Sequence, residues 1–373
     1  MSPLQTDIWT LNMGPQHPST HGVIRFVLKT DGEIIAEADP DVGFLHRGLE
    51  KIAELVPYPA FMPYTDRLDY LAAINMNWAW ALSVERLAGI EVPPRAEYLR
   101  VITAELNRIA SHLISIGSLA SDMGAFTPFV HAIRDRERIN DLFEELCGAR
   151  LTFNYVRIGG VGQDAPAGWC ERVRGFLDYY EPMIDVFNQL ISDNKIFVER
   201  LRQVAPVSAE MAKAYGLVGP NLRGSGVKFD LRKDEPYGIY PQLEFEVPVG
   251  RGYRDGVLGS CFDRYMVRIE ELRQCVKIIR QCLDRIPEGE IQVKVPKALR
   301  PPKGEVYCRT EAPRGEVGFY VISNGEKTPA RVKIRTGSWS AMSIIRELAQ
   351  GWMIADLVAI IGSLDVIAPE VDR

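Results

Sequence analysis

The stretch PPRAEYLRVITAELNRIASHLISIGSLASD, residues 93–122, decides the fold class. Its large aliphatic side chains recur at alternating spacings of three and four residues, at Leu99, Ile102, Leu106, Ile109, Leu113 and Ile116. This spacing predicts one long amphipathic helix that follows the proline pair and ends at Asp122. Further helices are predicted at about residues 66–87, 131–141, 170–204, 260–285 and 340–361. Asp66 is expected to cap the first of these, and Pro182 to kink the third.

Strand patterns surround this helical part. Short strands are expected at residues 8–12, 23–29 and 34–35, and two longer runs at 306–322 and 330–334 are expected to form a hairpin. Residues 218–258 hold many Gly and Pro and few periodic signals. The fold class expected is therefore α+β, with a mainly helical core and small antiparallel sheets at its periphery.

We expect a single domain over residues 1–373. It would comprise an N-terminal β region, a helical core in two segments and an irregular insertion, at residues 1–60, 61–216 with 259–373, and 217–258. No internal repeat or low-complexity segment stands out.

Composition excludes several classes of protein. Hydrophobic residues make up 46% of the chain and the net charge is only -5, without a long block of like charge, so nucleic acid is not an expected partner. The N-terminus has no secretory pattern, which predicts a cytoplasmic chain. No apolar run reaches the roughly 20 residues of a spanning helix, so any membrane contact is expected to be peripheral. The six cysteines form no C-x-x-C pair, and we expect all six to be buried free thiols rather than part of a metal knuckle.

The segment GPQHPSTHG, residues 14–22, contains His17 and His21, two of only five histidines. Pro18 disfavours helical geometry at His17, so the two imidazoles belong to a tight turn. One interpretation is that they cap this turn. The other is a proton donor, because an imidazole titrates near neutral pH.

Tyr70 and Asp122 allow the same two kinds of interpretation. Tyr70 is flanked by apolar residues, which is typical of core packing, yet a phenol can also hold a carbonyl oxygen and donate a proton to it. Asp122, at the negative end of the helix dipole, is either a solvated helix end or the partner of a cation such as a histidine. Arg47 and Arg67 are typical surface or ion-pair residues, although arginine also stabilises a nearby anionic redox centre.

Other catalytic motifs are missing from the sequence. GRGYRDG, residues 250–256, has the wrong spacing and no βαβ context for a dinucleotide loop. No phosphate-binding loop of the G-x-x-x-x-G-K type and no G-x-S-x-G elbow occurs. A simple NADH-binding or hydrolytic enzyme is disfavoured.

Eight ordered segments resemble one known family, the D-type, quinone-site subunits of respiratory complex I. They are GPQHPSTHG (14–22), GFLHRGLEK (43–51), PYTDRLDYL (63–71), ELNRIASHL (105–113), SDMGAFTPF (121–129), YVRIGGV (155–161), GSCFDRYMVRIEE (259–271) and GSLDVIAPEVDR (362–373). The resemblance runs from end to end and implies the fold of nickel-iron hydrogenase large subunits. Where such hydrogenases carry Asp-Pro-Cys-x-x-Cys, this chain has Asp365-Val366-Ile367-Ala368-Pro369-Glu370, so the metal ligands are absent.

The resemblance implies that the former metal cavity holds a quinone headgroup as substrate, with no metal or flavin bound by this chain. His21 and Tyr70 match the headgroup residues, His17 stays close to the loop, and Asp122 matches the carboxylate that pairs with the histidine. Arg47 and Arg67 match residues that face a 4Fe-4S cluster in the adjacent subunit. The implied activity is that of a proton-translocating NADH:quinone oxidoreductase, active only as the multisubunit complex.

The implied partners are the B-, C- and I-type subunits of the peripheral arm and the H-type subunit of the membrane arm. The implied location is the cytoplasmic face of the bacterial inner membrane. Three alternatives remain: a ferredoxin- or deazaflavin-driven relative, a scaffold subunit, and a membrane hydrogenase, which the missing cysteines oppose. Many relatives carry a histidine near the cluster where this chain has Thr152, which puts a pH-dependent cluster potential in doubt. Which quinone is used does not follow from the sequence.

Overall fold

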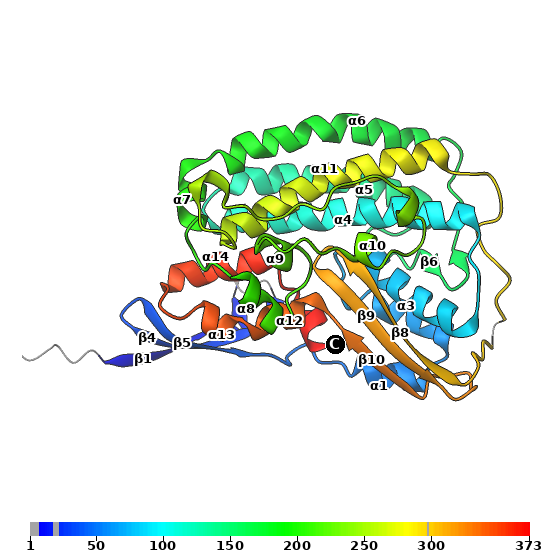
Figure 1. Ribbon diagram of the computed structural model, residues 1–373, viewed down its shortest axis with the longest axis horizontal. Coiled ribbons are helices and arrows are strands. Elements are labelled where there is room, and N and C mark those ends of the chain that lie inside the picture. Colours follow the sequence, from blue (N-terminus) through cyan, green and yellow to red (C-terminus); the bar gives the residue numbers. More distant parts are fainter. Residues whose placement is uncertain (1–6, 18–21, 297) are drawn as a thin grey trace, which may run out of the picture.

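A layer of long helices forms one side of the molecule (Figure 1). The structure, a computed structural model, describes residues 7–17, 22–296 and 298–373. The layer consists of α4 (Pro94–Asp122), α5 (Phe126–Cys147), α6 (Trp169–Phe187) and α11 (Cys261–Arg285). The long helix expected from the apolar stripe is confirmed as α4, which has Pro93 as its N-cap and Pro94 in its first turn.

Helix α4 is buried on all sides and not only along its apolar stripe. It packs against α5, α11, α14 (Ile354–Leu364) and α3 (Ala73–Ala88). Arg100, Glu105, Arg108 and His112 are therefore fully buried together with the aliphatic residues. Buried charges of this kind need partners within the protein, and these are described below.

Two three-stranded antiparallel sheets lie at the periphery. The N-terminal sheet has the order β1-β4-β5, with β1 (Ile8–Met13), β4 (Arg25–Asp31) and β5 (Ile34–Asp41). The second has the order β10-β9-β8, with β8 (Gly304–Ala312), β9 (Gly315–Ser323) and β10 (Arg331–Arg335). Two-stranded pairs complete the strands: β2 (Gln16–His17) with β3 (Gly22–Val23), and β6 (Val156–Arg157) with β7 (Gly160–Val161). The predicted α+β class, with a mainly helical core and small peripheral sheets, is confirmed.

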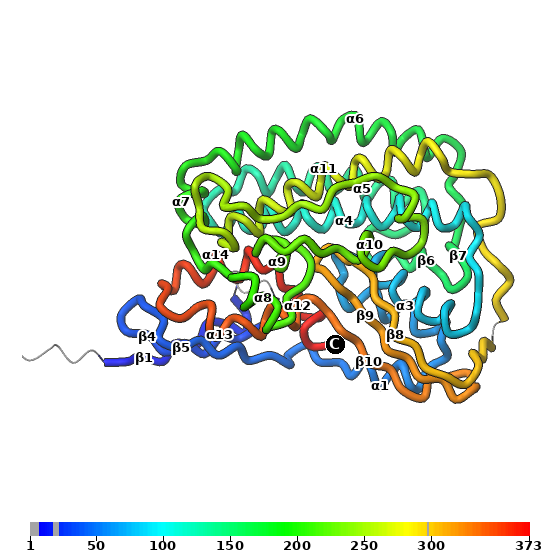
Figure 2. Tube along the Cα trace, viewed as in Figure 1, coloured from blue at the N-terminus to red at the C-terminus, as the bar shows by residue number. Residues whose placement is uncertain are grey.

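Shorter helices connect these layers. They are α1 (Leu49–Leu55), η2 (Tyr58–Phe61), α2 (Met62–Thr65), η3 (Asn188–Ser192), α7 (Lys195–Leu201), α8 (Ala209–Ala214), α9 (Gly219–Gly224), α10 (Leu231–Asp234), η4 (Tyr240–Gln242), η5 (Tyr253–Asp255), α12 (Gly337–Ser343), α13 (Ile345–Leu348) and α15 (Ala368–Asp372). The tube in Figure 2 places the C-terminal segment in the middle of the molecule, between the two three-stranded sheets.

Four element predictions were wrong in detail. The helix expected from Asp66 begins only at Ala73, and the helix expected over 170–204 breaks into α6, the π-helical turn η3 and α7. The expected helix over 340–361 divides into α12, α13 and α14. The run 306–322 is two strands, β8 and β9, which reverse direction at Pro313-Arg314. The last correction matters most, because it places Arg314 at a turn that points into the core.

Candidate functional site

Tyr70 lies in the turn between α2 and α3, not within a helix as its sequence context had predicted. The Asp69 carboxylate holds this turn, because its Oδ1 atom accepts hydrogen bonds from the backbone N–H groups of Leu71 and Ala72 at 3.1 and 3.3 Å. Tyr70 itself is 36% exposed. Burial raises the pKa of its phenol above the ordinary value, so the hydroxyl keeps its proton at neutral pH and can donate it.

Arg314 connects the Tyr70 turn to the C-terminal segment. Its Nη1 donates to Asp69 Oδ2 at 2.6 Å and to Ser111 Oγ at 3.0 Å, and its Nη2 donates to Asp365 Oδ1 at 3.1 Å. All four side chains are buried. Sequence reasoning missed Arg314, since an arginine in the middle of an expected strand carries no functional signal.

The C-terminal segment also anchors two loops. The Asp372 carboxylate accepts hydrogen bonds from the backbone N–H groups of Gly43 and Leu45 at 2.8 and 2.7 Å, which holds the loop that contains Arg47. A Cβ atom on Gly22 would lie only 2.9 Å from the Cβ of Ala368, so the end of the 14–22 segment reaches α15. The Tyr70 turn, the Arg47 loop and the end of the histidine segment therefore meet at residues 365–373.

The structure describes only one of the two histidines of the 14–22 segment. His21 lies outside the residues that the structure describes, so its predicted place beside Tyr70 stays a prediction. His17 is an exposed residue of β2 and lines a hollow of about 610 Å³ together with residues of β1 and α14. Tyr70 does not line that hollow.

Asp122 is the last residue of α4, as predicted, and its side chain is half-buried. The chain turns sharply after it, because the backbone N–H of Gly124 bonds to Ser121 O at 2.9 Å. The predicted pairing of Asp122 with His21 involves a residue outside the described part. It stays a prediction.

Arg47 and Arg67 are brought together. The Nη2 atom of Arg47 donates to the carbonyl oxygen of Arg67 at 2.8 Å, and both side chains line a hollow of about 620 Å³ whose other walls include Leu49, Ile52 and Pro63. Burial, followed by the nearby Arg67 cation, lowers the pKa of Arg47 below its ordinary value. Two close guanidinium groups favour a negatively charged neighbour at this surface.

Asp66, the expected helix cap, is instead buried behind Arg67. Its Oδ2 atom lies 3.6 Å from Arg67 Nη1. Burial raises the pKa of Asp66 to about 6, with hydrogen bonding from Asn77 opposing the shift. Thr152, which precedes β6, is half-buried.

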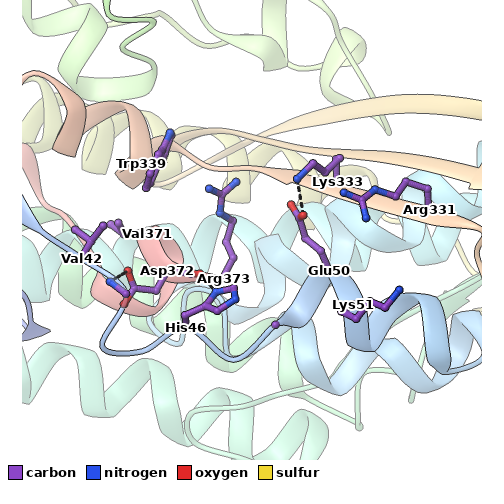
Figure 3. A pocket seen from close by; sticks show the side chains of 12 residues that line it. Val42, His46, Glu50, Lys51, Arg331, Lys333, Trp339, Val371, Asp372 and Arg373 are labelled. Atoms are coloured by element: carbon purple, nitrogen blue, oxygen red, sulfur yellow. Dashed lines mark hydrogen bonds and ion pairs between the residues drawn. The ribbon is translucent and has the colours of Figure 1, made fainter.

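Another hollow, the second one beside the Arg47 loop, is shown in Figure 3. Its volume is about 430 Å³, and Figure 3 shows Arg373 near its centre, between Trp339 and Glu50. The Arg373 guanidinium carbon lies 5.1 Å from the centre of the Trp339 ring, and Glu50 accepts a hydrogen bond from Lys333 Nζ at 2.6 Å. Four Lys or Arg side chains and two carboxylates line it.

A larger set of buried charges surrounds the polar side of α4, and we call it the core network. It comprises Glu105, Arg108, His112, Arg223, Asp230, Arg232, Glu271 and Glu311. Arg223 Nη2 lies 2.6 Å from Glu271 Oε1, and His112 Nε2 lies 2.7 Å from Glu271 Oε2. Although burial opposes it, Arg223 and the hydrogen bond from His112 hold the pKa of Glu271 well below its usual range.

Within residues 7–17, 22–296 and 298–373, no group of three or more His, Cys, Asp or Glu side chains could hold a metal ion. The six cysteines are free thiols, as predicted, but only four are buried as expected, because Cys147 and Cys170 are half-buried.

Comparison with known proteins supplies a family. Residues 122–301 and 294–373 match the family described as "Respiratory-chain NADH dehydrogenase, 49 Kd subunit". The chain is 60% identical over 370 residues to the D-type subunit, numbered 2, of the NADH-quinone oxidoreductase of Sorangium cellulosum, covering 98% of this chain and 95% of that protein. It is 58% identical to the protein of the same name from Anaeromyxobacter dehalogenans, covering 99% and 97%. It is 49% identical to the D-type subunit of the NADH-quinone oxidoreductase of Bacillus cytotoxicus, covering 99% and 100%.

Proposed function

The chain belongs to the family of the 49 kDa subunit of the respiratory-chain NADH dehydrogenase, and from this premise we propose that it forms the quinone-headgroup site of that enzyme. It is a subunit of an NADH-quinone oxidoreductase, and the activity is that of the multisubunit complex. The substrate reduced is accordingly a quinone.

One observation supports this site most directly. The Arg47 loop and the end of the 14–22 segment contact residues 365–373, and Arg314 connects the Tyr70 turn to the same residues, although these segments lie far apart in the sequence. Tyr70 supplies a phenol that keeps its proton at neutral pH and is partly exposed, as a group that contacts a substrate must be. This combination suits a hydrogen-bond donor to a quinone carbonyl.

In the proposed reaction, a quinone accepts two electrons and two protons and leaves as the quinol. The electrons come from a 4Fe-4S cluster of the neighbouring B-type subunit, towards which Arg47 and Arg67 present their paired positive charge. Tyr70 and His21 hold the two carbonyl oxygens and each supply one proton. Asp122 pairs with His21 and favours its protonated form, and His17 stays near the edge of the site.

The assembly proposed around this chain consists of B-, C- and I-type subunits and a membrane-embedded H-type subunit. Among the described residues, no helix has both the length and the apolar character needed to cross a bilayer. We place the chain peripherally, at the cytoplasmic face of the bacterial inner membrane, where membrane contact is made through its partners.

The test is Tyr70→Phe in the assembled complex. Removing the hydroxyl leaves the ring but no proton donor, so quinone reductase activity is expected to fall about 100-fold. Subunit content and electron transfer from NADH to ferricyanide should stay normal. Tyr179→Phe is the matched control, because Tyr179 lies on α6 in the helical layer and its hydroxyl donates to Asp135 of α5 at 2.8 Å.

A scaffold subunit is the competing function. It predicts unchanged quinone reductase activity for Tyr70→Phe in a complete complex. The D-type relatives are named for NADH, which favours this donor over ferredoxin or a deazaflavin. NADH-binding subunits encoded beside this chain would agree with that donor.

A further inference from the structure

Three buried carboxyl groups gather behind Tyr70, and we call them the terminal cluster: Asp69, Asp365 and Glu370. Arg314 binds the first two, at 2.6 Å from Asp69 Oδ2 and 3.1 Å from Asp365 Oδ1. The next cation is Arg268 on α11, whose Nε lies 3.7 Å from Asp365 Oδ2. Three carboxyl groups thus share two guanidinium groups, so the cluster is neutral when one carboxyl group carries a proton.

Glu370, on α15, is the member that is least well provided with partners. Its side chain is fully buried, and its Oε2 atom accepts a hydrogen bond from the Ser338 hydroxyl. Its Oε1 atom has no hydrogen-bond partner among the described residues. A buried carboxylate oxygen without a donor is costly, whereas the neutral carboxylic acid tolerates the same surroundings.

The charged and polar groups that face Glu370 come from four elements. Asp69 approaches from the turn before α3, Arg314 from the β8–β9 turn, Asp365 from the end of α14, and Ser338 from α12. Burial, reinforced by Asp69, raises the pKa of Glu370 to about 8, although Arg314 and Ser338 oppose the shift. The same Asp69 and Asp365 also raise the pKa of Tyr70, so one set of charges acts on both groups.

We propose that Glu370 is the proton store of the quinone site: it holds a carboxylic proton in the resting enzyme and returns it to Tyr70. This inference rests on the proposed function of Tyr70. Glu370 does not contact the substrate and acts through its neighbours. Asp69 links the two groups electrostatically, because its charge raises the pKa of both Glu370 and Tyr70.

The proton balance is closed. The phenolic O–H bond of Tyr70 breaks as its proton passes to a quinone oxygen, while the electrons arrive from the neighbouring subunit. The O–H bond of Glu370 then breaks, and its proton re-forms the Tyr70 hydroxyl. Glu370 is left as a carboxylate in a cluster that disfavours this charge, and it takes up a proton from water. No protein group is oxidised or reduced.

Glu370→Gln in the full complex is the test. Glutamine keeps the shape and can accept the Ser338 hydrogen bond, but it has no proton to return. At saturating quinone the rate is expected to fall about tenfold with KM unchanged. The wild-type rate should decline above about pH 8, where Glu370 is already ionised, and this decline should be absent from the variant.

Infrared difference spectra give a readout that does not depend on turnover. Glu311 and Asp66 lose their protons at lower pH, so the carbonyl band of a buried carboxylic acid that disappears only as pH rises through about 8 belongs to Glu370, and this band should be absent from Glu370→Gln. A variant with the wild-type rate and alkaline decline, or with the band still present, would overturn the proposal. Asp356→Asn is the matched control, because this buried carboxylate lies outside the terminal cluster, where it accepts a hydrogen bond from the backbone N–H of Met353 and pairs with Arg200 at 3.6 Å.

A second variant covers a failure of Glu370→Gln to assemble. Ser338→Ala keeps the carboxyl group but removes the hydrogen bond that lowers its pKa, so the alkaline decline should move to higher pH. An unmoved decline overturns the proposal. If Tyr70→Phe impairs turnover but the Glu370 and Ser338 variants behave as wild type, only the proton store is wrong. If Tyr70→Phe is fully active, the proposed function is wrong as well.

Discussion

The core network and the terminal cluster are both buried, but their carboxyl groups differ in how completely they are hydrogen-bonded. In the core network each oxygen of Glu105, Asp230, Glu271 and Glu311 accepts at least one hydrogen bond. In the terminal cluster, Asp365 Oδ2 and Glu370 Oε1 have no hydrogen-bond donor among the described residues. Carboxylates whose oxygens all accept hydrogen bonds thus hold the helical layer together, while the incompletely hydrogen-bonded carboxyl groups behind Tyr70 remain able to bind a proton.

Within the core network, Glu311 most resembles the carboxyl groups of the terminal cluster. Burial raises its pKa to about 7, although Arg223 opposes the shift. Both of its oxygens nevertheless have donors, Arg223 and the backbone N–H of Leu231. The difference between the two regions therefore concerns hydrogen-bond satisfaction, and not burial.

The largest expected effect comes from breaking the core network. Arg223→Ala leaves Glu271 and Glu311 without their shared cation, and we expect the free energy of unfolding to drop by about 3–5 kcal/mol. Denaturant or thermal unfolding of the complex measures this, together with subunit content. Arg172→Ala is the control: its partner Glu145 is exposed, so the loss should stay at about 0–1 kcal/mol. Equal losses in the two variants would contradict the structural role.

Removing the cation of the terminal cluster should cost less stability and more activity. In Arg314→Gln the neighbouring carboxyl groups can take up protons, and glutamine still offers a donor, so we expect about 1–3 kcal/mol of destabilisation. Quinone reductase activity should nevertheless fall at least about tenfold, because the Tyr70 turn loses its link to Asp365. A stability loss as large as that of Arg223→Ala, with normal turnover of the remaining complex, would show that Arg314 has the same structural role as Arg223 and would contradict the proposed difference between the two regions.

Asp122 belongs to neither region, which makes it a useful reference. Asp122→Asn keeps the end of α4 but removes the charge proposed to favour protonated His21. We expect turnover to fall about tenfold while subunit content stays native. An unchanged rate in a complete complex would remove Asp122 from the site.

The last prediction concerns the pH dependence of stability. The pKa of Glu370 is about 8 in the folded chain against an ordinary 4.5, so between these values the unfolded chain has lost a proton that the folded chain keeps. The free energy of unfolding therefore falls as pH rises through this window and levels off above it. Glu370→Gln should remove this contribution, whereas Asp356→Asn should keep it, as melting temperatures across the window would show. If the dependence of stability on pH is the same in both variants, Glu370 is not the group that holds this proton.

Much of the helical layer was predictable from periodicity. The helices α4 and α11 begin and end within one residue of their predicted bounds, since prolines or a serine cap mark their starts. The predicted helix cap at Asp66 was wrong, because a carboxylate before an apolar run gives the same sequence pattern whether it caps a helix or is buried. The turn at Pro313-Arg314 was missed because strand-forming residues continue on both sides of it.

By itself, the sequence determined the family, through eight motifs in order, and it identified Tyr70, His21 and Asp122 as candidates. Only the tertiary structure decided that Asp69, Arg314 and Glu370 share one buried cluster, with 245 residues separating the first two. The physical reason is that a charge pattern along the chain does not specify which charges become buried. Hydrogen-bond partners and proton affinity are set by the groups that packing brings close and by the water that packing excludes.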